Sequence, residues 1–178
     1  MNNRAVVTHI LDWLRAYLDN SKKQISTYVV GVSGGIDSAL VSKLCALTGK
    51  QTIVLTLPIK SPDISLSLLH CKQLVKEHPN VKHYEIDLSN MYDNFKDGFA
   101  NLGFSSDLGL ANTKARMRMI ALYQIAASSS GIVVGTGNKV EDFGVGFYTK
   151  YGDGGVDVSP IADLTKSEVR SLAGYLHI

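Results

Sequence analysis

The hexapeptide Ser33-Gly34-Gly35-Ile36-Asp37-Ser38 determines how the rest of this chain is interpreted. It follows an apolar, β-branched run at 28–32 and leads into a helical stretch at 39–47. A strand, a glycine turn and a helix start leave several backbone N–H groups without partners, and this geometry binds a phosphate group. The segment is therefore a candidate nucleotide-binding loop.

This loop differs from the commoner phosphate loop, which carries Lys and then Ser or Thr after its last glycine. Asp37 stands there instead, and its carboxylate would repel a polyphosphate unless a divalent cation lay between them, so the loop predicts Mg²⁺. Alternatively, the two glycines only connect strand and helix while Asp37 and Ser38 cap the helix. We disfavour that alternative because capping does not require both serines, both glycines and the aspartate together.

Strands and helices alternate along the chain. We expect strands at 27–33, 52–58, 81–87 and 131–136, and helices at 3–19, 36–48, 62–78 with Pro62 at its start, 89–97 and 110–129. This alternation predicts an α/β fold with a doubly wound, mostly parallel sheet and helices on both faces. Ligands bind such sheets at the carboxyl ends of the strands, so the glycine turns at 33–38 and 135–138 are expected to face one pocket.

The composition is that of an ordinary globular protein, with 178 residues, 45% hydrophobic and 19% charged residues. A net charge of +2 gives no support to a nucleic-acid or membrane partner, and without a signal-peptide pattern we expect a cytoplasmic location. Cys45 and Cys71 lie in apolar helical patterns and are interpreted as buried, reduced thiols.

We expect one domain over residues 1–178. Its last helix is begun by a capping box at Thr165 and Glu168 and is cut short, so we expect that a C-terminal part of the domain is missing.

The stretch 138–163 combines glycines with charges of both signs and aromatic residues. A loop of this length is usually functional or mobile, and we favour a substrate loop over a plain surface loop.

Several blocks of sequence resemble one known family. The loop 33–38 is similar to the pyrophosphate loop of the N-type ATP pyrophosphatases, which cleave ATP between its α and β phosphates. Three further blocks resemble the NAD synthetase family in order and spacing: Asn112-Thr-Lys-Ala-Arg116-Met-Arg118-Met, Gly135-Thr-Gly-Asn-Lys139-Val-Glu141, and Phe147-Tyr-Thr-Lys150-Tyr-Gly-Asp-Gly-Gly-Val-Asp157 with Pro160 and Leu164-Thr-Lys166. Together they cover most of residues 27–176.

The resemblance implies an adenine nucleotide alpha hydrolase-like (Rossmann-like) fold and a homodimeric enzyme that amidates deamido-NAD with ammonia, consuming ATP and releasing AMP and pyrophosphate. The nicotinate carboxylate attacks the α-phosphorus, so no enzyme nucleophile is expected. The resemblance implies Mg²⁺ ligands at Asp37 and Glu141 and deamido-NAD contacts at Arg116, Lys150 and Asp157. It implies ATP contacts at Gly31, Val32, Ser33, Gly34, Gly35, Ile36, Asp37, Ser38, Thr136 and Lys166.

Some readings stay open. Lys114, Arg116 and Arg118 by themselves fit the solvated face of an amphipathic helix; the block match favours Arg116 as a ligand and leaves Arg118 undecided. The segment between Glu141 and Lys150 is one residue longer than expected for the family. The stretch 57–63 lacks the family's usual arginine near ATP, for which Lys60 is a candidate substitute. Alternative functions are an N-type ATP pyrophosphatase with another acceptor, or an inactive nucleotide-binding fragment.

Overall fold

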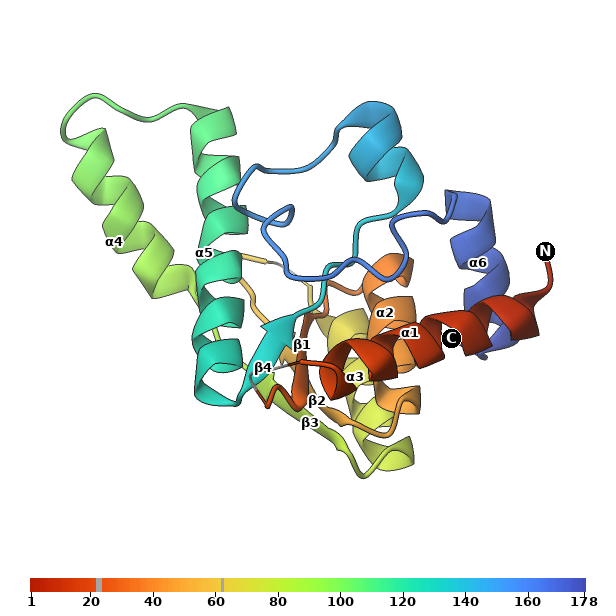
Figure 1. Ribbon diagram of the computed structural model, residues 1–178. Coiled ribbons are helices and arrows are strands. Elements are labelled where there is room, and N and C mark those ends of the chain that lie inside the picture. Colours follow the sequence, from red (N-terminus) through yellow and green to blue (C-terminus); the bar gives the residue numbers. More distant parts are fainter. Residues whose placement is uncertain (22–23, 62) are drawn as a thin grey trace.

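The computed structural model describes residues 1–21, 24–61 and 63–178, and within them a four-stranded parallel sheet carries helices on both faces (Figure 1). In chain order the elements are α1 Asn3–Asp19, β1 Thr27–Gly31, α2 Ile36–Leu47, β2 Gln51–Thr56, α3 Ser65–Glu77, β3 Val81–Glu85, α4 Ser89–Ala100, α5 Asp107–Ser128, β4 Gly131–Val133, η1 Val140–Val145 and α6 Lys166–Tyr175. The strand order is β3-β2-β1-β4, so the chain moves outward from β1 to β3 and then returns to the other side of β1. The predicted doubly wound α/β architecture is confirmed.

Strand β1 is buried on both faces and divides the core into two layers. Tyr28 and Val30 point into the layer formed with α1, α2, α3 and α6, whereas Val29 points into the layer formed with α4 and α5. All three side chains are fully buried. A parallel strand covered on both faces requires such a continuous apolar run, which is why the sequence signal for β1 is strong.

Most element boundaries lie close to the predicted ones, and the differences have local causes. Helix α1 matches the prediction, whereas α5 begins at Asp107, because the Ser106 hydroxyl caps it by accepting a hydrogen bond from the Gly109 N–H at 3.1 Å. Helix α3 begins at Ser65, and Pro62, the predicted start, lies outside the described residues. Strand β4 ends at Val133 and not at residue 136.

The segment 138–163 is more ordered than the long loop we expected. It contains the π-helix η1, in which hydrogen bonds span one residue more than in an α-helix. The one-residue insertion predicted from the family resemblance, between Glu141 and Lys150, overlaps this π-helix. The segment then returns to the sheet, where Val158 forms an isolated bridge with Val134. The predicted capping box is confirmed, with the Glu168 carboxylate accepting from the Thr165 N–H at 2.8 Å.

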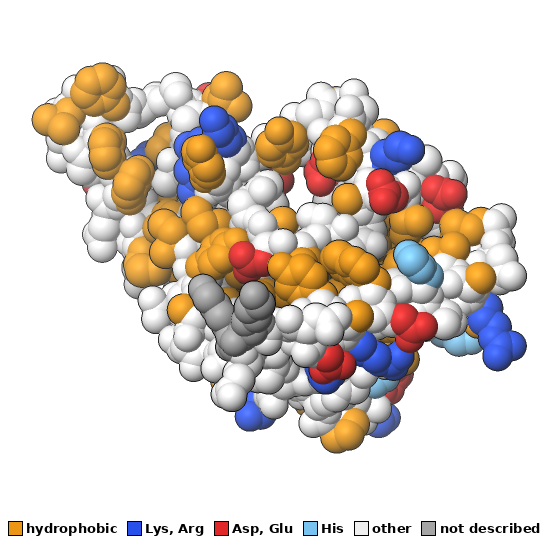
Figure 2. All heavy atoms as spheres, viewed as in Figure 1, with side chains coloured by type: hydrophobic (Ala, Val, Ile, Leu, Met, Phe, Trp, Pro, Cys, Tyr) orange, Lys and Arg blue, Asp and Glu red, His pale blue; other side chains and the backbone are white. Residues whose placement is uncertain are grey.

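Helix α4 and the beginning of α5 extend away from the sheet and form an arm (Figure 1). Figure 2 shows hydrophobic side chains gathered on its surface. Phe95, Phe99, Leu102, Phe104 and Leu108 are between 44% and 73% exposed, and Tyr92 is the buried residue of α4. Exposed apolar patches of this kind are uncommon on monomers and mark interaction sites.

We expect Tyr28→Phe to lower the free energy of unfolding by about 1 kcal/mol, the usual contribution of one hydrogen bond. The Tyr28 hydroxyl donates to the buried Leu14 carbonyl oxygen at 2.7 Å and so fastens α1 to β1. Urea denaturation measures the change, with Tyr84→Phe as the control because that ring is 48% exposed. Equal effects of the two substitutions would contradict the assigned role of the Tyr28 hydroxyl.

Candidate functional site

Two adjoining pockets lie at the carboxyl ends of β1, β2 and β4. The larger, of about 530 Å³, extends from the ends of these strands to α5 and has apolar walls that include Leu57, Met119 and Leu122. The smaller, of about 140 Å³, is lined mainly by polar groups of the 33–38 loop and of residues 136–142. Ser33, Thr136 and Asp153 line both. The expectation that the two glycine turns face one site is confirmed, and the site lies at the switch in strand order.

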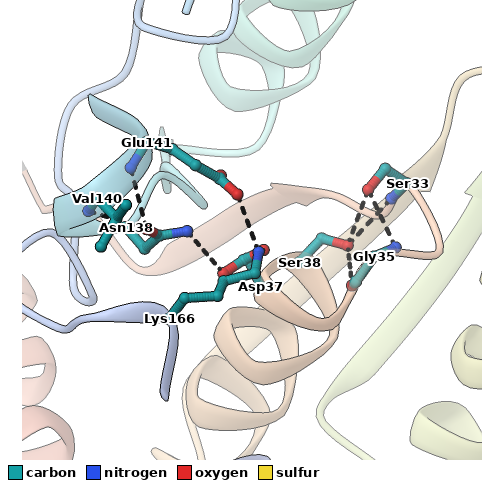
Figure 3. Close-up of polar contacts among 8 residues, drawn as sticks. All are labelled: Ser33, Gly35, Asp37, Ser38, Asn138, Val140, Glu141 and Lys166. Carbon is teal, nitrogen blue, oxygen red and sulfur yellow. Dashed lines mark hydrogen bonds and ion pairs between the residues drawn. The ribbon is translucent and has the colours of Figure 1, made fainter. Parts of the chain in front are cut away.

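The 33–38 loop is held in shape by its own serines (Figure 3). The Ser38 hydroxyl accepts from the Ser33 N–H at 3.2 Å and donates to the Gly35 carbonyl oxygen at 2.9 Å. Gly34 adopts a φ of 89°, a conformation that side chains rarely allow. The Ser33 and Gly35 N–H groups are thus used within the loop, the latter on the Ser33 hydroxyl.

The N-terminus of α2 supplies the remaining free donors. Gly35 occupies the cap position and no side chain caps the helix, so the alternative in which Asp37 and Ser38 act as caps is wrong. The first-turn N–H groups have no intrahelical partner, and together with the helix dipole they favour an anion at this point. Ile36 instead packs its side chain against the core.

A cluster of charges closes the polar pocket. The Lys166 ammonium, at the start of α6, forms ion pairs with Asp37 and with Glu141, the latter at 2.9 Å (Figure 3). Burial lowers the pKa of Lys166, but its hydrogen bonds to the two carboxylates outweigh this effect and raise the pKa above its usual value. Three residues from different parts of the sequence, each of them a predicted site residue, therefore meet at one point.

Asn138 organises this cluster and was not among the predicted site residues. Its side chain is fully buried and donates to the Asp37 carboxylate at 3.0 Å. The side-chain oxygen Oδ1 of Asn138 accepts hydrogen bonds from the N–H groups of Val140 and Glu141, at 3.0 and 3.2 Å, and so fixes the start of η1. The asparagine after Gly137 in the quoted block was the available signal, because this residue type commonly caps helix starts.

Two further carboxylates, of Asp142 and Asp153, line the polar pocket and also escaped prediction. Burial, followed by the negative charges of Asp153, Glu141 and Asp37, raises the pKa of Asp142. Asp142 lies against Gly137, where a Cβ would be 1.9 Å from its carboxylate oxygen, so a side chain at position 137 would displace this carboxylate.

The residues predicted to bind deamido-NAD fall in two places. Arg116 and Lys150 are exposed neighbours, since the Arg116 Nε donates to the Lys150 carbonyl oxygen at 3.2 Å. The Asp157 carboxylate is already engaged, accepting from the Val133 N–H at 2.8 Å and from the Tyr123 hydroxyl at 3.1 Å. Those two bonds hold the 152–158 segment against the end of β4, and none of these three predicted residues lines either pocket.

Lys60 does not replace the missing ATP-site arginine. It adopts a φ of 52°, its N–H donates to the Ser89 hydroxyl at 2.9 Å, and its ammonium forms an ion pair with Asp93 at 2.7 Å. These contacts direct it toward α4, and it lines neither pocket.

The donor set fits a magnesium ion only in part. Within residues 1–21, 24–61 and 63–178 no group of three or more His, Cys, Asp or Glu side chains is arranged to hold a metal. Asp37 and Glu141 offer two hard carboxylates, and the chain's own cation, Lys166, already sits against both. Mg²⁺ is commonly bound by one or two carboxylates together with substrate phosphates and water, so this pair fits such an ion.

Comparison with known proteins identifies the family. The NAD synthase family profile matches residues 6–178. The chain belongs to this family. It is 38% identical to the NH3-dependent NAD(+) synthetase of Archaeoglobus fulgidus and 39% identical to that of Saccharolobus solfataricus. The alignments cover 100% and 97% of this chain, which spans 70% and 60% of those relatives.

Two solved structures have the same fold as this chain. The NMN synthetase from Francisella tularensis superposes with a TM-score of 0.88 at 31% identity, covering 100% of this chain and 72% of its own. The NH3-dependent NAD synthetase from Campylobacter jejuni, in complex with a nitrate ion, gives 0.87 at 32% identity, with 100% and 75% covered.

We expect Asn138→Ala to lower the free energy of unfolding by about 2 kcal/mol, since three hydrogen bonds to a buried side chain are lost. It should also weaken ATP binding, because Asp37 loses the group that orients it. Urea denaturation and calorimetric titration with ATP measure the two effects. Asn101→Ala, at an exposed position after α4, is the control. Unchanged stability and ATP affinity in the Asn138 variant would contradict this role.

Proposed function

We propose that this chain catalyses the amidation of deamido-NAD with ammonia, consuming ATP and releasing AMP, pyrophosphate and NAD. The observation that carries the proposal is the meeting of Asp37, Glu141 and Lys166 beside an uncapped helix N-terminus, in a chain of the NAD synthase family. Cleavage of ATP to AMP requires charge to be neutralised on the departing pyrophosphate, and preorganised cationic groups supply that stabilisation.

The two pockets suggest how ATP lies. The larger pocket has apolar walls suited to the adenosine, between Gly31, Val32 and α5. The smaller is polar and of a size for phosphate groups, with Ser33, Gly35, Ser38 and Thr136 around it. Lys166 would transfer its hydrogen bonds from the carboxylates to the terminal phosphates. The predicted ATP contacts are consistent with this placement.

Asp37 and Glu141 would hold the divalent cation that accompanies ATP. When bound, Mg²⁺ supplies positive charge that stabilises the pyrophosphate leaving group. The protein's part is to hold the two carboxylates in place through Asn138 and the start of η1.

The acceptor would be bound by the exposed side of the site. Arg116 presents a guanidinium, which suits a carboxylate or a phosphate, and Lys150 lies beside it. Asp157 remains a predicted contact of deamido-NAD. In the structure its carboxylate holds the loop that follows Lys150 against β4.

The reaction then needs no covalent enzyme intermediate. A nicotinate carboxylate oxygen forms a bond to the α-phosphorus while the bond to the bridging oxygen of pyrophosphate breaks. Ammonia next forms a bond to the acyl carbon, AMP leaves with the electron pair of the carbon–oxygen bond, and one proton passes from nitrogen to solvent. The protein contributes proximity and electrostatic stabilisation.

A shorter acceptor is the second candidate, because one solved relative of 31% identity is described as an NMN synthetase. Its amidated product is a mononucleotide, so the corresponding acid would occupy less of the surface near Lys150. Nucleotide binding without turnover is the third candidate function, because the chain spans only 60–70% of the length of the relatives named above.

We expect incubation with ATP, Mg²⁺, ammonium and deamido-NAD to yield AMP and NAD in equal amounts, measured by chromatography. Nicotinic acid mononucleotide, offered in parallel, should react at least ten times more slowly. Asp37→Asn serves as the control that removes the carboxylate charge from the proposed metal site, and it should lose about 100-fold or more in rate. Release of ADP, or a preference for the mononucleotide, would overturn the proposed reaction or its substrate, and ATP binding without AMP release would favour the nucleotide-binding alternative.

We also propose that the protein is a homodimer, with the α4–α5 arm in the interface. The arm buries little of its own apolar surface, and a second copy of the same chain would cover it without any further partner. The family resemblance gave the same expectation.

We expect Phe104→Glu to convert the dimer to a monomer, because the exposed ring is replaced by a charge inside the interface. Sedimentation velocity measures the change. Leu69→Glu on α3 is the matched control, since the two side chains are 70% and 64% exposed on different parts of the surface. A monomeric parent protein, or a Phe104 variant that stays dimeric, would contradict the proposal.

A cytoplasmic location completes the proposal. Cys45 and Cys71 are both free and buried, as predicted, which suits a reducing compartment. None of the described helices has the length and apolar character needed to cross a membrane.

A further inference from the structure

Arg118 is a cation in the wall of the larger pocket without an acidic partner. Its Nε donates to the Leu57 carbonyl oxygen at 2.9 Å and thereby ties α5 to the carboxyl end of β2. A guanidinium has five N–H donors, and no other hydrogen bond or ion pair of this one occurs in the described part of the chain. Its terminal nitrogens are therefore available to a molecule in the pocket that Arg118 lines.

Arg15 provides a comparison, because all three of its guanidinium nitrogens donate hydrogen bonds. Its donors reach the carbonyl oxygens of Thr48 and Leu47, at 3.1 and 3.2 Å, and the Asp12 carboxylate at 3.2 Å. Among the described residues, Arg118 is bound at one nitrogen only, and burial lowers its pKa. A desolvated charge that lacks a partner is costly, and a bound anion removes that cost.

The charges of the two pockets indicate which anion fits. The carboxylates of Asp37, Glu141, Asp142 and Asp153 line the polar pocket, and Lys166 is ion-paired with the first two, so this pocket suits phosphates that carry a divalent cation. Arg118 is the one basic side chain among the described residues that line the larger pocket. The phosphate attached to the nucleoside would lie in the larger pocket, away from the carboxylates proposed to hold the cation. A guanidinium that donates hydrogen bonds to it can balance its charge there.

We propose that Arg118 binds the α-phosphate of ATP, and afterwards the phosphate of the adenylate formed from it. The Leu57 bond fixes the side chain, so the two terminal nitrogens form a preorganised fork in the wall of the larger pocket, which shares Ser33, Thr136 and Asp153 with the polar pocket. The inference rests on the proposed function for the identity of the nucleotide. It gives this chain an ATP-site arginine on α5 where the 57–63 stretch provides none.

Binding of adenosine and of AMP tests the proposal, because the two ligands differ only in the phosphate in question. Isothermal titration of the unaltered protein should show AMP binding more tightly than adenosine. In Arg118→Met this advantage should fall by about 10- to 100-fold, the range that hydrogen bonds to charged groups correspond to, while adenosine affinity stays unchanged. Arg118→Lys should retain part of the advantage, since it keeps the charge and loses the fork.

Arg15→Met is the matched control, because it removes a guanidinium that also clamps a helix to backbone carbonyls but lies away from the pockets. It should leave the difference between AMP and adenosine unchanged. An undiminished AMP advantage in Arg118→Met, an equal loss for adenosine, or no AMP advantage in the unaltered protein would each overturn the proposal. Because no acceptor is present, a failure to form NAD leaves this result standing and counts only against the proposed reaction.

Discussion

The parallel pairing of β4 with β1 is the constraint on which the site depends. It joins the two strands in register, with Val29 opposite Val133, on the side of β1 away from β2. Both strands end on the same side of the sheet, β1 continuing into the 33–38 loop and β4 into residues 135–142. The pockets form between them because no neighbouring crossover covers the sheet at this point. The Asp157 carboxylate then fastens the next loop to the end of β4.

Electrostatics explains why the acidic side of the site is stable without a ligand. Asp37 and Glu141 share the Lys166 ammonium, and Asn138 donates to Asp37 from a fully buried position. The amide thus directs one carboxylate and begins the helix that carries the other. Under the proposed function, a carboxylate held in this way loses little freedom when a phosphate-bound cation binds, so its geometry is preorganised for that step.

The sequence was most informative where one local rule governs the structure. The apolar run of β1, the spacing of α1 and the capping box of α6 each predicted an element correctly, as did the glycine turns for the site. Contacts between distant residues were harder. The Asp157 carboxylate holds β4, Lys60 turns toward Asp93, and Asn138 links a loop to a helix through its buried amide. Such roles depend on the packed geometry, and neither periodicity nor composition encodes them.

The charged cluster joins positions that lie 129 residues apart for Asp37 and Lys166, and 25 apart for Glu141 and Lys166. Closing loops of that size is entropically unfavourable, so the cluster exists only once β4 and α6 have docked on the β1 layer. The unfolded chain therefore lacks this cluster. Under the proposed function, ATP binds the native state alone, so by mass action saturating ATP adds its whole binding free energy, at that concentration, to the stability of the fold.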